Sequence, residues 1–298
     1  MIKMEFKKIT FDDFELINRY TKLANTRNCE FSMVNIYFWN DTSKLEYAVI
    51  DEVLVYRLIE NGTAFYSITE FPDNPKEFFE KLEADAEENS AGMVMNNLSE
   101  EMMLRMEHDM AGQLRFWYDR DYSDYIYEVQ DLINLSGSKY HGKKNHLNKF
   151  MNTYQFRYEE ITACNIEECR KMKNEWALRK GGDISGYREE LDVIDNVFDN
   201  FDRLNLIGGL IRIDGEVSAF TLGEAISGDT FVTHFEKAYE DIPGLYQAIN
   251  QQFAARSIYG FKYVNREDDI GIMGIRNAKL SYKPVMMFNK YNAEKTVR

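Results

Sequence analysis

The chain has 298 residues, of which 44% are apolar and 14% aromatic, so it can build packed cores in two domains or in one large one. Its formal net charge of -14 argues against broad, non-specific binding to nucleic acid or to anionic membranes, because phosphate contacts need clustered lysine and arginine. Three cysteines, Cys29, Cys164 and Cys169, lack CxxC spacing, which argues against a disulfide framework and a zinc site.

The N-terminal segment 1–8 has basic residues but no apolar h-region after them. No later stretch approaches the roughly 20 apolar residues that span a bilayer. We therefore expect a cytoplasmic protein without membrane insertion, in which any polyanion binds to a local basic patch.

The first half of the chain opens with a predicted strand over 5–10 and a predicted helix over 11–20, for which Thr10 is a suitable N-cap. One aromatic residue, two charged residues, isoleucine and threonine follow one another at 6–10, and the same pattern returns at 158–162. This recurrence half a chain apart predicts an internal duplication.

Each half also contains a predicted antiparallel hairpin. The hairpin strands are expected over 46–59 and 63–68 in the first half, and over 206–213 and 216–222 in the second. Asn61-Gly62 joins the first pair and Asp214-Gly215 the second, and both dipeptides favour two-residue turns. A helix over 75–86 follows the first hairpin, with proline in its first turn, where a backbone N–H is not needed.

A turn-rich stretch, 134–138, predicts the boundary between two domains, 1–137 and 138–298. The segment that follows it, 139–149, holds four lysines and two histidines and no acidic residue. In so acidic a chain this run suggests an anion-binding connector helix, and a solvated helix face is an equally favoured interpretation.

The second half alternates strands and helices. We predict a strand over 230–238, a turn over 239–244, a helix over 245–258, a strand over 261–264, a helix over 272–280 and a strand over 284–288. Gly244 ends the turn, so the first amides of the helix, at Leu245 and Tyr246, are available to a phosphate. Lys143 or Lys144 of the connector helix would help to bind this phosphate. The alternative interpretation of the segment is an ordinary strand-to-helix turn without a ligand.

This order of elements resembles the second half of a GNAT-type acyltransferase, in which a splayed strand, a pyrophosphate-binding turn and the next helix hold the acyl carrier. Segment 279–285 resembles the helix-to-strand corner that ends many such domains. The turn departs from the family pattern because Glu240, Asp241 and Pro243 replace a glycine-rich, basic loop. Asn277 stands where many relatives carry a general-acid tyrosine.

The chain also resembles, over nearly its whole length, a bacterial family allied to the C-terminal domain of phosphatidylglycerol lysyltransferases. The segments that carry this resemblance are 32–39, 138–150, 234–238, 244–250, 265–271 and 274–279. It implies an α+β fold of two tandem GNAT-like domains, each a mixed, mostly antiparallel sheet flanked by helices. It also implies that 138–298 carries the active cleft and that 1–137 is a degenerate copy. The lysyltransferases move lysine from charged tRNA to a lipid head group with the help of a membrane domain, so the resemblance does not identify this chain's acceptor.

Acyl transfer to an amine or hydroxyl requires a positioned ester or thioester, a base and a donor for the oxyanion. His234 and Glu236 share one face of a predicted strand and are the candidate catalytic pair, with Asp268 as a third candidate. The structural alternatives are a hydrogen-bonded core histidine and a cross-strand ion pair for Glu236.

Charged residues follow the predicted strand 261–264, where α/β sheets place ligand groups. Arg266, Glu267 and Asp269 are candidate substrate-binding residues, since adjacent acids suit a cationic aminoacyl group. Helix capping is the alternative for one of the acids. Arg276 and Lys279 lie one helical turn apart and suit a carboxylate or phosphate.

The leading hypothesis is an acyl- or aminoacyltransferase that takes its acyl group from coenzyme A (acyl-CoA) or from charged tRNA. The net charge favours the small thioester, because few phosphate contacts are expected outside 139–149. The alternative is a binding protein that kept the duplicated fold and lost catalysis. A metal enzyme would depend on His141 and His146, whose spacing matches no metal-ligand pattern, so we predict no metal.

Overall fold

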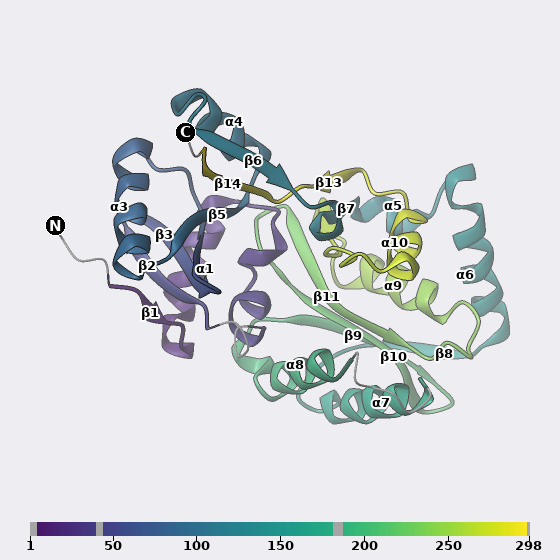
Figure 1. The fold of residues 1–298 in the computed structure, drawn as a ribbon. Helices are drawn as coiled ribbons and strands as arrows, with labels where there is room; N and C mark the ends of the chain where they lie inside the picture. The colour runs from purple at the N-terminus through teal and green to yellow at the C-terminus, as the bar shows by residue number, and fades with distance from the viewer. Residues whose placement is uncertain (1–4, 40–43, 181–186, 297–298) are drawn as a thin grey trace. The chain divides into compact units, whose positions relative to one another are not determined.

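The computed structural model describes residues 5–39, 44–180 and 187–296, and the chain forms two compact units (Figure 1). Neither unit is one continuous stretch. The first contains 1–124, 268–271 and 287–298, and the second contains 125–267 and 272–286. Residues 125–137 therefore pack with the second unit, and the C-terminal segment packs with the first, unlike the continuous domains 1–137 and 138–298 that the sequence predicts.

The first unit is built on a seven-stranded mixed sheet with the order β1-β2-β3-β4-β5-β14-β6. Its strands are β1 (Lys7–Lys8), β2 (Glu46–Ile50), β3 (Val53–Glu60), β4 (Thr63–Ile68), β5 (Gly92–Leu98), β14 (Tyr291–Lys295) and β6 (Leu114–Tyr118). Neighbouring strands are antiparallel except β4 and β5, which are parallel and are connected through a helix.

The second unit is built on a sheet of seven strands with the order β8-β9-β10-β11-β12-β7-β13. Its strands are β8 (Phe156–Glu160), β9 (Ile207–Ile213), β10 (Glu216–Ala225), β11 (Thr230–Ala238), β12 (Tyr263–Asn265), β7 (Asp124–Glu128) and β13 (Met286–Phe288). Here β11 and β12 are the parallel pair, again connected through a helix, and β8 to β11 form an antiparallel meander.

The two sheets share one topology, which confirms the predicted duplication. Each has an antiparallel run of four strands, a parallel pair between the fourth and fifth, and two further strands. The sixth strand is exchanged between the halves of the sequence. β7 precedes the predicted boundary and lies in the second sheet, while β14 ends the chain and lies in the first.

Helices cover both sheets. The first unit contains α1 (Phe14–Ala24), α3 (Pro75–Glu88) and α4 (Glu100–Asp109), a π-helix (Val34–Phe38) and 3-10 turns at Phe11–Asp13, Cys29–Phe31 and Arg120–Tyr122. The second contains α5 (Val129–Asn134), α6 (His141–Thr153), α7 (Ile166–Arg179), α8 (Arg188–Asp199), α9 (Leu245–Arg256) and α10 (Met273–Leu280), with 3-10 turns at Ser138–Tyr140 and Phe201–Arg203. In the second unit, α7 and α8 lie on one face of the sheet and α9 on the other (Figure 1).

Local sequence signals account for many of these elements. Asn61 and Asp214 adopt left-handed φ angles of 49° and 50°, and each is followed by a glycine with positive φ, as the predicted hairpin turns require. The apolar stripe of α9 is buried, and its Phe253 packs against Phe231 of β11 with ring centroids 5.6 Å apart. The last two predicted strands are shorter and shifted, at 263–265 and 286–288. Within the described residues, none of the helices is both long and apolar enough to cross a membrane.

Candidate active site on the second sheet

Glu236 and Lys237, neighbours on β11, point to opposite faces of the sheet as alternation predicts. Glu236 points toward α9, where the amide of Asn250 donates to it. Lys237 points to the other face, where its Nζ lies 2.7 Å from Oε1 of Glu190 and 4.4 Å from the ring centroid of Trp176. The register between β10 and β11 shifts at His234, so the alternation does not continue from Glu236 to His234, and the His234 ring centroid lies 6.2 Å from that of the adjacent Phe235.

His234 is held between two carboxylates. Its Nε2 lies 3.1 Å from Glu224 and its Nδ1 lies 2.9 Å from Glu267, while its side chain is only 1% exposed. Burial alone would lower its pKa, but the hydrogen bonds with both carboxylates outweigh burial and raise the pKa of His234 to about 9. At neutral pH both ring nitrogens then donate, so the geometry favours an electrostatic role over the general-base role expected from the sequence. We call these three residues the His234 cluster.

A second group of polar side chains surrounds Glu236. Nη2 of Arg266 lies 2.8 Å from one carboxylate oxygen of Glu236, and Nδ2 of Asn250 lies 3.2 Å from the other. Lys143 stands above the ring of Tyr282, 4.2 Å from its centroid, and the Arg266 guanidinium lies 5.2 Å from the same centroid. We call Glu236, Arg266, Asn250 and Lys143 the Glu236 cluster.

The Glu236 cluster is partly removed from water and has unused hydrogen-bonding capacity. Burial, followed by the nearby Arg266 charge, lowers the pKa of Lys143. Among the described residues, neither Nε of Arg266 nor Oδ1 of Asn250 has a hydrogen-bond partner. Buried polar atoms are nearly always paired, so one donor and one acceptor here suit a polar ligand.

Gly244 begins α9 in a left-handed conformation, with a φ of 88°. A Cβ at this position would overlap the carbonyl oxygen of His146 and would lie 2.9 Å from Cβ of Phe150, both on α6. The amide of Leu245 donates to the carbonyl of Ile242 over 3.2 Å. Gly244 is therefore required by the backbone and by the close approach of α6, whether or not an anion binds there.

The acidic residues of the turn before α9 are paired with basic residues from the end of α7. Arg179 contacts Asp241 at 3.2 Å, and Lys180 forms an ion pair with Glu240. The neighbouring Tyr246 is buried, which raises its pKa to about 12. The charge of this turn is thus offset locally, by residues that the sequence pattern did not single out.

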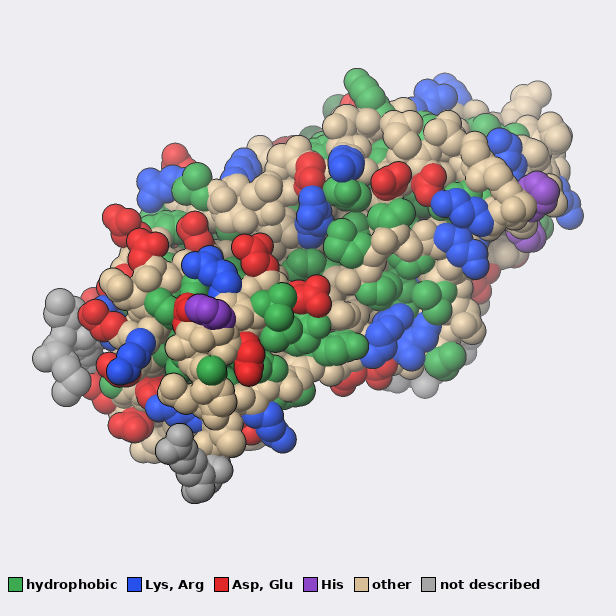
Figure 2. Space-filling view, turned by 90° about the horizontal axis from the view of Figure 1, so that it is seen from above, with side chains coloured by type: hydrophobic (Ala, Val, Ile, Leu, Met, Phe, Trp, Pro, Cys, Tyr) green, Lys and Arg blue, Asp and Glu red, His purple; other side chains and the backbone are tan. Residues whose placement is uncertain are grey.

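The remaining predicted basic residues lie around α10 and α6. Lys144 is exposed and donates to the carbonyl of Asn134, and Lys279 lies 5.7 Å from the ring centroid of Tyr125. Arg276 is half-buried on α10. None of the residues that the structure describes in α10 is buried, and the exposed large apolar side chains here are Ile272, Met273, Ile275, Leu280, Val285 and Met286. Figure 2 shows apolar and basic side chains side by side on the face that it presents.

Asp268 and Asp269 belong to the first unit, whereas Arg266 and Glu267 belong to the second. Asp268 lies 3.3 Å from the buried Lys290, and Asp269 accepts from the amide of Gly271 over 3.0 Å. The chain leaves the second unit directly after Glu267, so the predicted catalytic set of His234, Glu236 and Asp268 is divided between units. Within the described ranges, no group of histidine, cysteine and acidic side chains is placed to hold a metal ion.

The sequence did not indicate two members of the clusters, Glu224 and Asn250, or Tyr282, whose ring lies beside Lys143 and Arg266. Glu224 lies near the end of the strand predicted as 216–222, and a charge in an otherwise apolar run was the available signal. Asn250 is a buried polar residue of α9, and Tyr282 follows α10. Their side chains meet His234, Glu236 and Lys143 only through tertiary packing.

The clusters carry opposite formal charges. Two carboxylates and one imidazolium give the His234 cluster a formal charge of about -1, and two cations and one carboxylate give the Glu236 cluster about +1. Since His234 and Glu236 are two residues apart on a strand, their Cα atoms are separated by roughly 7 Å. This part of β11 therefore holds a cluster suited to a cationic group and a cluster suited to an anionic one.

The chain is similar to known proteins in sequence and in fold. The family model described as phosphatidylglycerol lysyltransferase, C-terminal, matches residues 21–294. A conserved protein of unknown function from Bacteroides thetaiotaomicron is 35% identical, with a TM-score of 0.91 over 99% of this chain and 100% of that one. L-PGS from Bacillus licheniformis is 16% identical, with a TM-score of 0.59 over 85% of each chain. FemX is 9% identical, with a TM-score of 0.61 over 97% of each chain.

The last two similarities concern the fold alone, because the identities are low. They agree with the duplicated topology of the two sheets, and the fold is that of two tandem GNAT-like domains, as the sequence predicted.

Proposed function

Because the chain belongs to the family of phosphatidylglycerol lysyltransferase C-terminal domains, we propose that its second unit transfers an activated aminoacyl group to an amine or hydroxyl acceptor. The observation that supports this proposal is the pair of oppositely charged clusters around His234 and Glu236, two residues apart on β11. An aminoacyl ester has an ammonium group next to a carbonyl that becomes an oxyanion during transfer. Its charges complement the two clusters.

The ammonium group of the substrate binds at Glu267, whose side chain is 25% exposed while that of His234 beneath it is closed to solvent. Arg266 and Lys143 donate to the ester carbonyl oxygen as negative charge develops on it. Glu236, beside them, accepts the proton of the attacking amine or hydroxyl, and that proton returns to the leaving group. His234 holds Glu267 and Glu224 in position as an imidazolium.

The proposed donor is aminoacyl-tRNA, because the His234 cluster recognises a cation that a plain acyl thioester lacks. Acyl-CoA is the alternative donor. The features that favour it are the left-handed Gly244 before α9, with the amides of Leu245 and Tyr246, and the chain's acidity. The neighbouring carbonyl of His146 opposes a phosphate at this turn.

The surface around α10 is proposed to receive the acceptor. Its exposed apolar side chains lie on the same short helix as Arg276 and Lys279, and the segment 272–286 contains no acidic residue. Apolar groups flanked by basic ones suit an amphiphile with an anionic head. An anionic lipid with a hydroxyl-bearing head group is therefore the first acceptor to test.

The test is label transfer. The full chain is incubated with tRNA charged with radiolabelled lysine or alanine and with vesicles that contain phosphatidylglycerol, and the label in lipid is counted. We expect enzyme-dependent transfer that Glu267→Gln reduces about 10-fold or more. Glu216→Gln, at an exposed carboxylate of β10, is the matched control and should transfer normally. Transfer from acyl-CoA in place of aminoacyl-tRNA would contradict the proposed donor.

The salt dependence of binding separates the donors further. Binding of tRNA through several phosphates should weaken with a slope of roughly 0.7 to 0.9 in log affinity against log salt for each phosphate neutralised. Replacing Lys139, Lys143, Lys144 and Lys149 by glutamine should abolish tRNA binding and reduce coenzyme A binding only in part. Equal losses for both ligands would show that these lysines do not distinguish them.

A further inference from the structure

A pocket lies in the first unit and is lined by none of the residues to which we assign transfer. It has a volume of roughly 410 Å3, within the range of small-molecule sites. Helices α3 and α4 and strands β5, β6 and β14 enclose it, all in the unit whose sheet lacks the charged clusters. Its walls are unusual because four methionines line it, namely Met93, Met95, Met106 and Met110.

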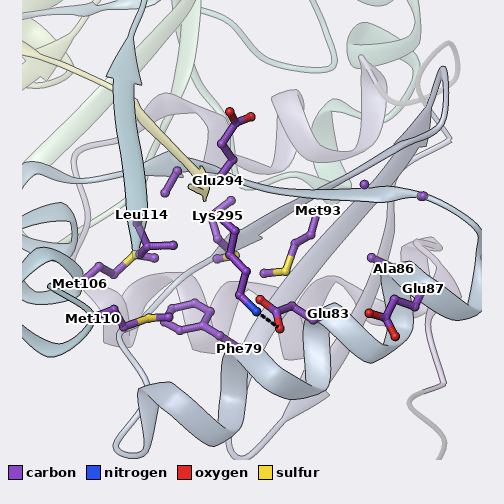
Figure 3. A pocket seen from close by; sticks show the side chains of 14 residues that line it. Phe79, Glu83, Ala86, Glu87, Met93, Met106, Met110, Leu114, Glu294 and Lys295 are labelled. Atoms are coloured by element: carbon purple, nitrogen blue, oxygen red, sulfur yellow. Dashed lines mark hydrogen bonds and ion pairs between the residues drawn. The ribbon is translucent and has the colours of Figure 1, made fainter. Parts of the chain in front are cut away.

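The pocket has an apolar end and an acidic end. Figure 3 shows Phe79, Met106, Met110 and Leu114 around one end. Met106 and Phe79 are buried, so this end is a recess in the core of the unit. Methionine side chains are unbranched and flexible, and they adapt to linear or irregular apolar ligands.

Glu87 and Glu83 of α3 lie at the other end (Figure 3). Lys295 reaches from β14 to Glu83, with 2.6 Å between Nζ and the carboxylate oxygen, so that carboxylate is neutralised. A third acid, Glu294, is paired with Arg115 at 2.7 Å. Among the described residues, no basic side chain pairs with Glu87, which is exposed at the rim. The uncompensated charge at this end is therefore negative.

We propose that this pocket binds an unbranched aliphatic amine, with the alkyl chain among Phe79, Met106 and Met110 and the ammonium group at Glu87. Burial of the chain supplies the affinity, since each methylene moved from water to an apolar site strengthens binding about three- to fourfold. The carboxylate of Glu87 favours a head group with a positive charge. The inference is independent of the transfer reaction, because it concerns other residues in the other unit.

The probe is decylamine, titrated calorimetrically into the full chain below the concentration at which it forms micelles. We expect one site. Butylamine, with the same head group and a shorter chain, should bind at least 100-fold more weakly. Decanoate, with the same chain length and the opposite charge, should bind more weakly than decylamine. Decanoate binding as tightly as decylamine would overturn the proposal.

Two further measurements locate the amine. Glu87→Gln should weaken decylamine binding about threefold. Glu88→Gln, at the neighbouring exposed carboxylate outside the pocket, is the matched control and should leave binding unchanged. In methyl-labelled protein, decylamine should shift the methyl resonances of Met106 and Met110. Unchanged methionine resonances, or equal effects of the two glutamine variants, would overturn the proposed position.

Discussion

The two sheets place different chemistry at equivalent positions of their parallel strand pairs. The pairs begin at Thr63 opposite Gly92 in the first sheet and at Thr230 opposite Tyr263 in the second. Four residues further along each strand are Ser67 and Asn96 in the first sheet, and His234 and Glu267 in the second. Oγ of Ser67 and Oδ1 of Asn96 form a neutral hydrogen bond of 2.7 Å, whereas His234 and Glu267 form an ion pair of 2.9 Å.

The positions one residue before Asn96 and Glu267 differ in the same way. Three residues beyond Gly92 is Met95, which lines the apolar pocket, and three residues beyond Tyr263 is Arg266, which pairs with Glu236. One topology thus supports neutral and apolar side chains in one unit and charged side chains in the other. Strand order therefore does not locate the reactive unit, whereas a few side chains at these positions do.

Replacing Arg266 by methionine, the residue at the equivalent position of the first sheet, should have the largest effect. It removes the proposed oxyanion donor, so aminoacyl transfer should fall about 100-fold or more. It also leaves the half-buried Glu236 without its guanidinium partner, which should lower the free energy of unfolding by about 3 kcal/mol. Transfer rates and urea unfolding measure the two effects.

The Glu236→Gln, Arg266→Met double variant separates stability from catalysis. It should recover much of the lost free energy of unfolding, because no unpaired charge is left, and it should still fail to transfer. A double variant with normal transfer would refute the role of the Glu236 cluster.

The His234 cluster should make stability depend on pH in a range where Ser67 and Asn96 do not titrate. The folded state raises the pKa of His234 from 6.5 to about 9, so the stabilisation is fully present below about pH 6.5 and is lost as the pH rises through about 9. The loss should amount to roughly 3 kcal/mol at most. Urea unfolding between these pH values should show a flatter profile for His234→Gln. The exposed His108 provides the control, since His108→Gln should keep the profile of the parent chain.

Substitution of Gly244 measures how far the stability of the chain depends on a glycine at the start of α9. Gly244→Val should lower the free energy of unfolding by about 2 to 3 kcal/mol, because valine disfavours positive φ and its Cβ would press on α6. Gly228→Val is the control, because nothing lies near a Cβ at that position within the described structure. Equal unfolding curves for the two variants would show that α6 does not constrain Gly244.

The smallest effect is expected in the first sheet. Ser67→Ala removes two neutral hydrogen bonds, with Asn96 and Asn97, and should lower the free energy of unfolding by about 1 to 2 kcal/mol without changing transfer. Transfer assays of Ser67→Ala and Glu267→Gln, run in parallel, measure the difference between the two sheets in the transfer reaction. A loss of transfer in Ser67→Ala would place the first sheet in the reaction and remove the distinction drawn between the units.

The features that depend on near neighbours in the chain can be predicted from the sequence. Asn61-Gly62 and Asp214-Gly215 specify tight turns through backbone preference, and alternation places Glu236 and Lys237 on opposite faces of β11. The repeated pattern at 6–10 and 158–162 indicated the duplication. These signals are local because backbone torsion and side-chain direction are set by a few adjacent residues.

Which side chains contact one another depends on the packing of distant segments and cannot be predicted from local sequence. Glu224 comes from β10 and Glu267 from the segment after β12, and their joint contact makes His234 an imidazolium, which no spacing in the sequence reveals. Asp268 follows Glu267 by one residue and pairs with Lys290 in the other unit, because the chain crosses between units at that point. The exchange of β7 and β14 has the same origin. A strand can satisfy its backbone hydrogen bonds at any free edge of a sheet. Which edge is free for β7 or for β14 depends on the other strands of each sheet.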